Sequence, residues 1–116
     1  MKLLMHILKK NDKLNIDNTT LSLTQISGKL TEEYTEVVEA LEDYYLDRSL
    51  IKLKEVVRET FDLIQMCILI LWRCHRKAQD LDESNLIQDI NLEHKDKIIT
   101  ERGWIIETGI EIDIKE

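Results

Sequence analysis

Two acidic blocks decide how this chain is expected to fold: Glu-Glu-Tyr-Thr-Glu at positions 32–36 and Glu-Thr-Phe-Asp at positions 59–62. In each block two carboxylates stand three positions apart: Glu33 with Glu36, and Glu59 with Asp62. Residues three apart on a helix are neighbours on one face, with Cβ atoms about 5–6 Å apart. Two helices that turn these faces toward each other would gather four carboxylates around one point. Such an oxygen-only ligand set predicts a site for Mg²⁺, or for Mn²⁺ in its place, rather than for zinc.

The segment around the first block has the periodicity of an amphipathic helix. We predict this helix from a capping box at Ser22 and Gln25, with Thr19 or Thr20 as the alternative cap, to about Asp47. Its apolar stripe recurs every three or four residues and consists of Ile26, Leu30, Val37, Leu41 and either Tyr44 or Tyr45. Glu33 occupies a stripe position where an apolar residue belongs. Because burying an unpaired carboxylate is costly, Glu33 indicates a bound cation. Gly28 is a poor helix former within this segment, and close helix packing is one interpretation of it.

The second block lies in another expected long helix, from about Leu50 to about His75. Its apolar run, Leu63–Trp72, surrounds most of the helix, which predicts a buried helix covered partly by a second subunit. The run is about half the roughly 20 residues that span a bilayer, so we expect no membrane association. Cys67 and Cys74 lie on the stripe of this helix, where packing in the core is the favoured interpretation over zinc binding.

The outer segments are expected to be shorter elements. They are a helix at residues 2–9, a polar loop at 11–20, a charged connector at 73–83, a helix at 92–102 that Gly103 ends, and a strand at 110–114. The predicted fold is an all-α helical bundle of two long antiparallel helices plus shorter helices. Oligomerisation completes the bundle, and a short C-terminal strand is possible. We expect a single domain over residues 1–116.

Composition restricts the functional classes. The net charge of −7 argues against nucleic-acid binding, which requires a basic face. Two cysteines cannot build a disulfide framework, and the N-terminal apolar run is too short for a signal peptide. These features predict a soluble protein of the cytoplasm.

The order Glu32-Glu33-x-x-Glu36, 22 intervening residues and Glu59-x-x-Asp62 resembles the signature of the MazG-like all-α nucleoside triphosphate pyrophosphohydrolases. The resemblance covers about Thr24 to Cys74. A weaker similarity lies in Arg102-Gly103-Trp104-Ile105, because many members close their last helix with a basic residue and a tryptophan. The asparagine that many members place shortly before this basic residue is replaced here by Ile98, Ile99 and Thr100.

The resemblance implies Mg²⁺-dependent hydrolysis of a (deoxy)nucleoside triphosphate to the monophosphate and pyrophosphate, for cleaning or regulating the nucleotide pool. It implies that Glu33, Glu36, Glu59 and Asp62 bind the metal and that Glu36 and Glu59 are catalytic. Glu32 would support these ligands or bind a second metal. Family members are dimers or tetramers, so a homodimer or homotetramer is implied. An acidic site holds a polyanionic triphosphate only through metal ions, which is consistent with this assignment.

Two further possibilities remain from the sequence. Lys54 and Arg58 are four residues apart near the second block, so they share a helix face and are weak candidates for phosphate contacts. The alternative function is a non-catalytic helical interaction module, a degenerate relative whose acidic face binds a protein partner.

Overall fold

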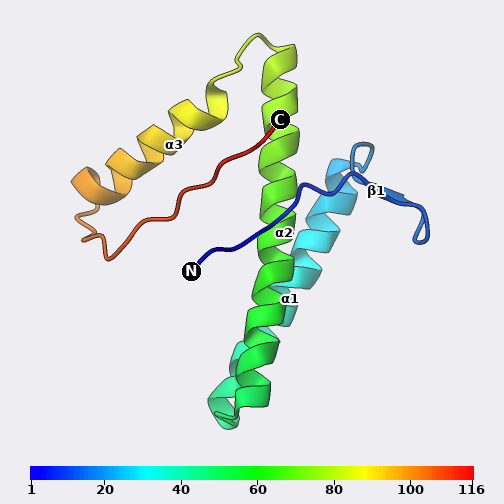
Figure 1. Cartoon of the computed structure of the whole chain (residues 1–116), viewed down its shortest axis with the longest axis vertical. Helices are drawn as coiled ribbons and strands as arrows, with labels where there is room; N and C mark the ends of the chain where they lie inside the picture. Colours follow the sequence, from blue (N-terminus) through cyan, green and yellow to red (C-terminus); the bar gives the residue numbers. More distant parts are fainter. The chain divides into compact units, whose positions relative to one another are not determined.

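The computed structural model describes residues 1–116 and is mostly helical (Figure 1). The elements are β1 (Lys10–Asn11), β2 (Ile16–Asp17), α1 (Leu23–Leu46), α2 (Leu50–Asp80), α3 (Leu86–Asp96) and the π-helix η1 (Lys97–Glu101). The predicted all-α class is confirmed. The chain forms two compact units, Met1–Lys77 and Ala78–Glu116, and each is described by itself below. A single domain over residues 1–116 stays a prediction.

Helix α1 begins where the capping box predicts. The Ser22 hydroxyl accepts a hydrogen bond from the Gln25 backbone N–H at 3.1 Å, and the Gln25 side-chain oxygen accepts one from the Ser22 N–H at 2.9 Å. Two of the N–H groups that a helix start leaves without partners are thereby satisfied. The helix ends at Leu46, where the Asp47 N–H donates to the Asp43 carbonyl at 3.0 Å.

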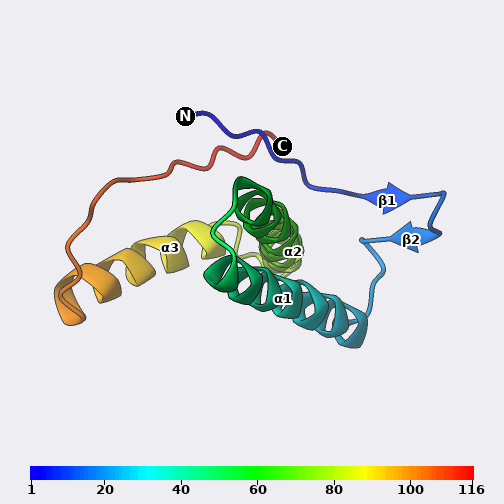
Figure 2. The same cartoon turned by 90° about the horizontal axis from the view of Figure 1, so that it is seen from below.

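Helices α1 and α2 lie side by side and run antiparallel (Figures 1 and 2). A small apolar core joins the start of α1 to the second half of α2. Leu21, Ile26 and Leu69 are more than nine-tenths buried in it, and Ile16, Met66 and Ile70 pack around them. This core fixes which turns of the two helices lie opposite each other.

The predicted charged connector at residues 73–83 is wrong, because α2 continues five residues past His75 to Asp80. The residues involved are charged but include no glycine or proline, so nothing in them breaks a helix. Ala78 is only 2% exposed, and α2 ends where Asp82 adopts a positive φ of 59°. The Glu83 N–H then donates to the Ala78 carbonyl at 2.8 Å, as is usual at helix C-termini.

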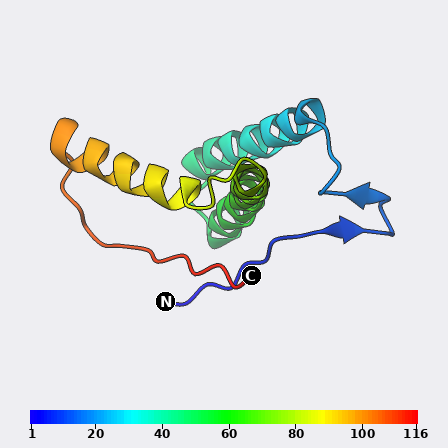
Figure 3. The same ribbon diagram turned by 90° about the horizontal axis from the view of Figure 1, so that it is seen from above.

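The predicted helix at residues 2–9 is also wrong, since this segment is extended and leads into a β-hairpin (Figure 3). Two of its carbonyl groups accept hydrogen bonds from side chains. Gln65 of α2 donates to the His6 carbonyl at 2.7 Å, and Asn18 donates to the Leu8 carbonyl at 3.0 Å. Within the hairpin, Asn15 has a positive φ of 53°, a conformation that asparagine tolerates better than most residues. Polar side chains of the predicted loop therefore organise the N-terminal segment.

In the second unit the predicted helix at 92–102 starts earlier, as α3 at Leu86, and continues as η1. Gly103 ends it with a φ of 69°, which confirms the predicted role of this glycine. No strand forms at residues 110–114. Alternation alone does not make a strand, because each strand needs a neighbour to accept its backbone hydrogen bonds.

Within one chain the apolar run of α2 is only partly covered. Of residues 63–72 only Leu69 is buried, whereas Leu71 is 51% exposed. Cys67 and Cys74 are exposed, so their predicted place in the core is wrong for this chain. None of the helices has both the length and the apolar character that crossing a membrane would require.

Candidate metal centre

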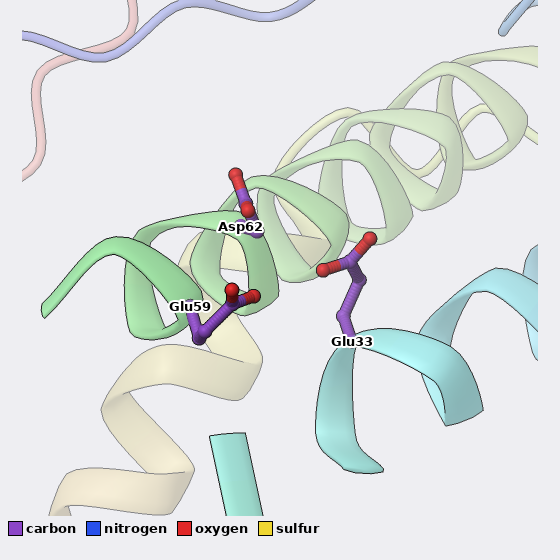
Figure 4. Close-up of side chains that lie close together, drawn as sticks. All are labelled: Glu33, Glu59 and Asp62. Carbon is purple, nitrogen blue, oxygen red and sulfur yellow. The ribbon is translucent and has the colours of Figure 1, made fainter. Parts of the chain in front are cut away.

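Three of the predicted site residues come together between α1 and α2. Glu33 projects from α1 toward α2, where Glu59 and Asp62 lie one turn apart (Figure 4). Each of the three carboxylates places an oxygen within 4.8 Å of the other two. Glu33 therefore forms one acidic cluster with two residues that lie 26 and 29 positions later in the sequence.

The register of the two helices explains this meeting. Ile26 of α1 and Leu69 of α2 pack in the same apolar core. Glu33 follows Ile26 by seven residues, and Asp62 precedes Leu69 by seven. Seven residues are two helical turns, or about 10.5 Å of rise, and the helices are antiparallel, so the same step along each helix leads to the same level. The apolar contact thus sets the carboxylates opposite each other.

Glu36 completes the predicted set, although it does not belong to the trio of mutually close carboxylates. It lies one turn beyond Glu33 on α1, and its carboxylate acts on both Glu33 and Glu59 through hydrogen bonding and charge. The structure therefore brings the acidic groups of both blocks into one electrostatic neighbourhood.

The pKa values of two of these groups are raised. For Glu33 the main cause is burial, followed by the negative charges of Glu36 and Asp62. For Glu59 the main cause is hydrogen bonding with Glu36, and then burial and the charges of Glu36 and Asp62. In both cases the surroundings disfavour the ionised form, as expected where like charges are held together.

The cluster lacks the groups that would normally neutralise it. Oε2 of Glu33 and Oε2 of Glu59 are shut off from solvent and have no hydrogen-bond partner. None of the four carboxylates has an ion pair with a lysine or an arginine. Buried carboxylate oxygens without donors are costly, and a hard divalent cation binds such oxygens directly. The residues present therefore fit a divalent cation.

The remaining predicted site residues lie outside this cluster. Arg58 forms an ion pair with Glu55 on α2, and Lys54 is exposed and makes no ion pair. Glu32 is exposed and lines a separate cleft beside the hairpin. Glu55 is not among the predicted site residues, and its negative charge also raises the pKa of Glu59. The spacing of Glu55 and Arg58, three residues apart on a helix, is the signal that predicts their pairing.

The fold and the site together define an all-α helical hairpin with an interhelical carboxylate cluster. Comparison of the chain with known protein families, with curated proteins and with solved structures gave no match. The function is therefore inferred from the residues and their geometry.

The raised pKa values predict a pH dependence of stability in the absence of metal. A carboxyl group whose pKa is higher in the folded than in the unfolded protein stabilises the fold below its ordinary pKa of 4.5. This contribution is lost as the pH rises through the raised pKa. Measured by urea unfolding in EDTA, the free energy of unfolding of wild type relative to Glu33→Gln should fall as the pH rises from about 4.5 to 7. A difference that stays constant or grows with pH would contradict the prediction.

Proposed function

We propose that the chain is a Mg²⁺-dependent nucleoside triphosphate pyrophosphohydrolase, with Mn²⁺ as a possible substitute metal. The observation that carries this proposal is the interhelical cluster of Glu33, Glu59 and Asp62, which contains two buried oxygens without partners and no basic residue. These residues are also the positions at which the sequence resembles the MazG-like signature. A nucleotide substrate is supported by the same cluster, because a metal ion would link the carboxylates to a polyanionic phosphate chain.

In this proposal Glu33, Glu36, Glu59 and Asp62 hold the metal. The ion would offset the charge of phosphate oxygens and lower the pKa of a water molecule in the site. Glu36 lies close enough to Glu59 to raise the pKa of its carboxyl group, and this pair is proposed to orient the attacking water and accept its proton. Glu32, which lies outside the cluster, would support the ligands or bind a second ion. Lys54 is proposed as a weak phosphate contact, whereas Arg58 would first have to leave Glu55.

The test is a panel of ribo- and deoxyribonucleoside triphosphates incubated with Mg²⁺ or Mn²⁺, each with and without EDTA. We expect nucleoside monophosphate and pyrophosphate in equal amounts, and no turnover in EDTA. Orthophosphate with the diphosphate as product would assign the protein to another reaction class. No turnover of any nucleotide with either metal would instead favour the non-catalytic interaction module.

We further propose a homodimer or homotetramer that acts in the cytoplasm. The exposed apolar side chains of α2, such as Ile64 and Leu71 at 38% and 51% exposure, support the oligomer. They lie in one apolar run, and a second copy of the chain would remove this surface from water. Light scattering at micromolar concentration should give a multiple of 13.7 kDa for wild type. Leu71→Asp should shift the population toward the monomer, and a wild type of 13.7 kDa would contradict the proposal.

A further inference from the structure

A cleft of about 760 Å³ lies between the β1–β2 hairpin and the first half of α1. Its size is within the range of small-molecule sites. The hairpin contributes Asn15 and Ile16, and α1 contributes Gln25, Gly28, Lys29 and Glu32. Ile16 belongs also to the apolar core, so one wall of the cleft is anchored to the helix pair.

Gly28 is unexplained by packing. A Cβ atom placed on it would meet no atom within 4 Å, so the interpretation of close helix packing is wrong for this chain. Glycine disfavours a helix interior, and its φ here is not in the left-handed region that would require it. Because Gly28 has no side chain, there is open space at this position in the wall of the cleft. Glycine is often found where a ligand must approach the backbone closely.

Two polar groups of the cleft have no partner within the chain. The Asn15 side-chain amide and the Lys29 ammonium group make no hydrogen bond or ion pair, and Lys29 is half-buried. Other polar side chains of the cleft have partners within the chain. Lys10 forms an ion pair with Asp12 at 3.4 Å, and Asp17 accepts hydrogen bonds from Thr19. An amide both donates and accepts hydrogen bonds, as the edge of a nucleobase does, and Ile16 and Leu21 add apolar surface to a lining that is otherwise polar.

The cleft and the carboxylate cluster share helix α1. Gln25, Gly28, Lys29 and Glu32 recur at the spacing of one helix face. Lys29 lies one turn before Glu33, about 6 Å along the helix axis. A ligand in the cleft therefore lies within one or two helical turns of the metal ligands on α1.

We propose that this cleft binds the nucleoside part of the substrate, so that the phosphate chain extends past Lys29 toward the carboxylate cluster. This inference rests on the proposed function and identifies the cleft as the part of the site that selects the substrate. The charges of the cleft favour this orientation. Three acidic residues (Asp12, Asp17 and Glu32) outnumber the two lysines along its lining, so a phosphate chain is disfavoured there while an uncharged base and sugar are not.

Filling the cleft tests the inference. Gly28→Leu introduces a side chain that the backbone accommodates, and Gly28→Ala is the matched control, because it shares the gain in helix propensity but adds one carbon. We expect Gly28→Leu to raise the KM for nucleoside triphosphate at least about tenfold, which corresponds to about 1.4 kcal/mol. Gly28→Ala should change it less than about threefold. The increase in melting temperature caused by Mg²⁺ alone should be the same in all three proteins.

Asn15→Gly is a second variant, because it keeps the positive φ of the turn and removes the amide. It should change the ranking of kcat/KM among the four bases without changing the Mg²⁺-induced stabilisation. If circular dichroism shows that Gly28→Leu is not helical, this variant decides the question.

The results of these experiments distinguish failure of the cleft inference from failure of the proposed function. An unchanged KM in folded Gly28→Leu overturns the cleft inference while leaving the proposed function intact. Loss of the Mg²⁺-induced stabilisation in Gly28→Leu also counts against it, since the added side chain would then act on the metal site. A wild type that hydrolyses no nucleotide overturns the proposed function, and the cleft inference with it.

Discussion

Glu59→Gln and Asp62→Asn are expected to reduce turnover of nucleoside triphosphate by more than about 100-fold. Residues that only orient metal ligands already cost about 10- to 100-fold when they are changed, and these two residues are proposed as ligands themselves. Both substitutions keep the shape of the side chain and remove its charge. Weaker Mg²⁺ binding, measured by calorimetry, should accompany the loss of activity.

The same two variants are expected to be at least as stable as wild type without metal. The carboxylates of Glu33, Glu59 and Asp62 lie close together with no basic partner, so their mutual repulsion opposes folding. Neutralising one of them should leave the melting temperature in EDTA unchanged or raise it. In excess Mg²⁺ wild type should have the higher melting temperature, because only wild type keeps all the proposed metal ligands.

Glu55→Gln is the matched control, since Glu55 is an acidic residue on the same helix, one turn before Glu59, with Arg58 as its partner. Breaking this exposed ion pair should lower the free energy of unfolding by less than about 1 kcal/mol and leave the Mg²⁺-induced stabilisation in place. A marked fall in the melting temperature of Glu59→Gln and Asp62→Asn in EDTA, with no stabilisation of wild type by Mg²⁺, would remove the metal site from this interpretation.

The two long helices could be predicted because their signals are local. The capping box at Ser22 and Gln25 and the spacing of apolar residues each act within a few turns of one helix. The meeting of Glu33 with Glu59 and Asp62 could also be predicted, because each block marks one face of its helix. The register of the helices is a tertiary property of the Ile26 and Leu69 contact, and no single segment encodes it.

Two of the wrong predictions concern segments whose backbone partners are distant in the sequence or missing. The carbonyl of His6 is bonded by Gln65, 59 residues later, and this contact competes with a helix at residues 2–9. The alternating residues at 110–114 have the pattern of a strand but no strand to pair with. The end of α2 differs from the prediction for a local reason: charged residues with long side chains are good helix formers, so the charged run after His75 continues the helix to Asp80. No sequence pattern predicts the cleft beside Gly28, because the β1–β2 hairpin forms one of its walls and the hairpin itself was not predicted.

Leu69→Ala is expected to cause a large loss of stability, about 2–5 kcal/mol, because Leu69 is 6% exposed at the centre of the small apolar core. Leu23→Ala is the control: Leu23 lies on α1 but is 82% exposed, so its truncation should change the free energy of unfolding by less than about 0.5 kcal/mol. Urea unfolding of the three proteins in EDTA measures both effects.

The stabilisation of Leu69→Ala by Mg²⁺ tests whether helix packing and metal binding depend on different residues. Leu69 lies seven residues from Asp62, about 10.5 Å along α2, and substitutions at this distance are usually additive with effects at the site. Leu21, Ile26, Met66 and Ile70 remain in the core of this variant and keep the register of the helices. The same excess of Mg²⁺ should therefore stabilise the folded variant by the same free energy as wild type, about 2.7 kcal/mol at 100 times the dissociation constant. Glu59→Gln should lose this increment while keeping its stability in EDTA. If Leu69→Ala were no less stable than Leu23→Ala, the Ile26 and Leu69 contact would not set the register that brings the carboxylates together.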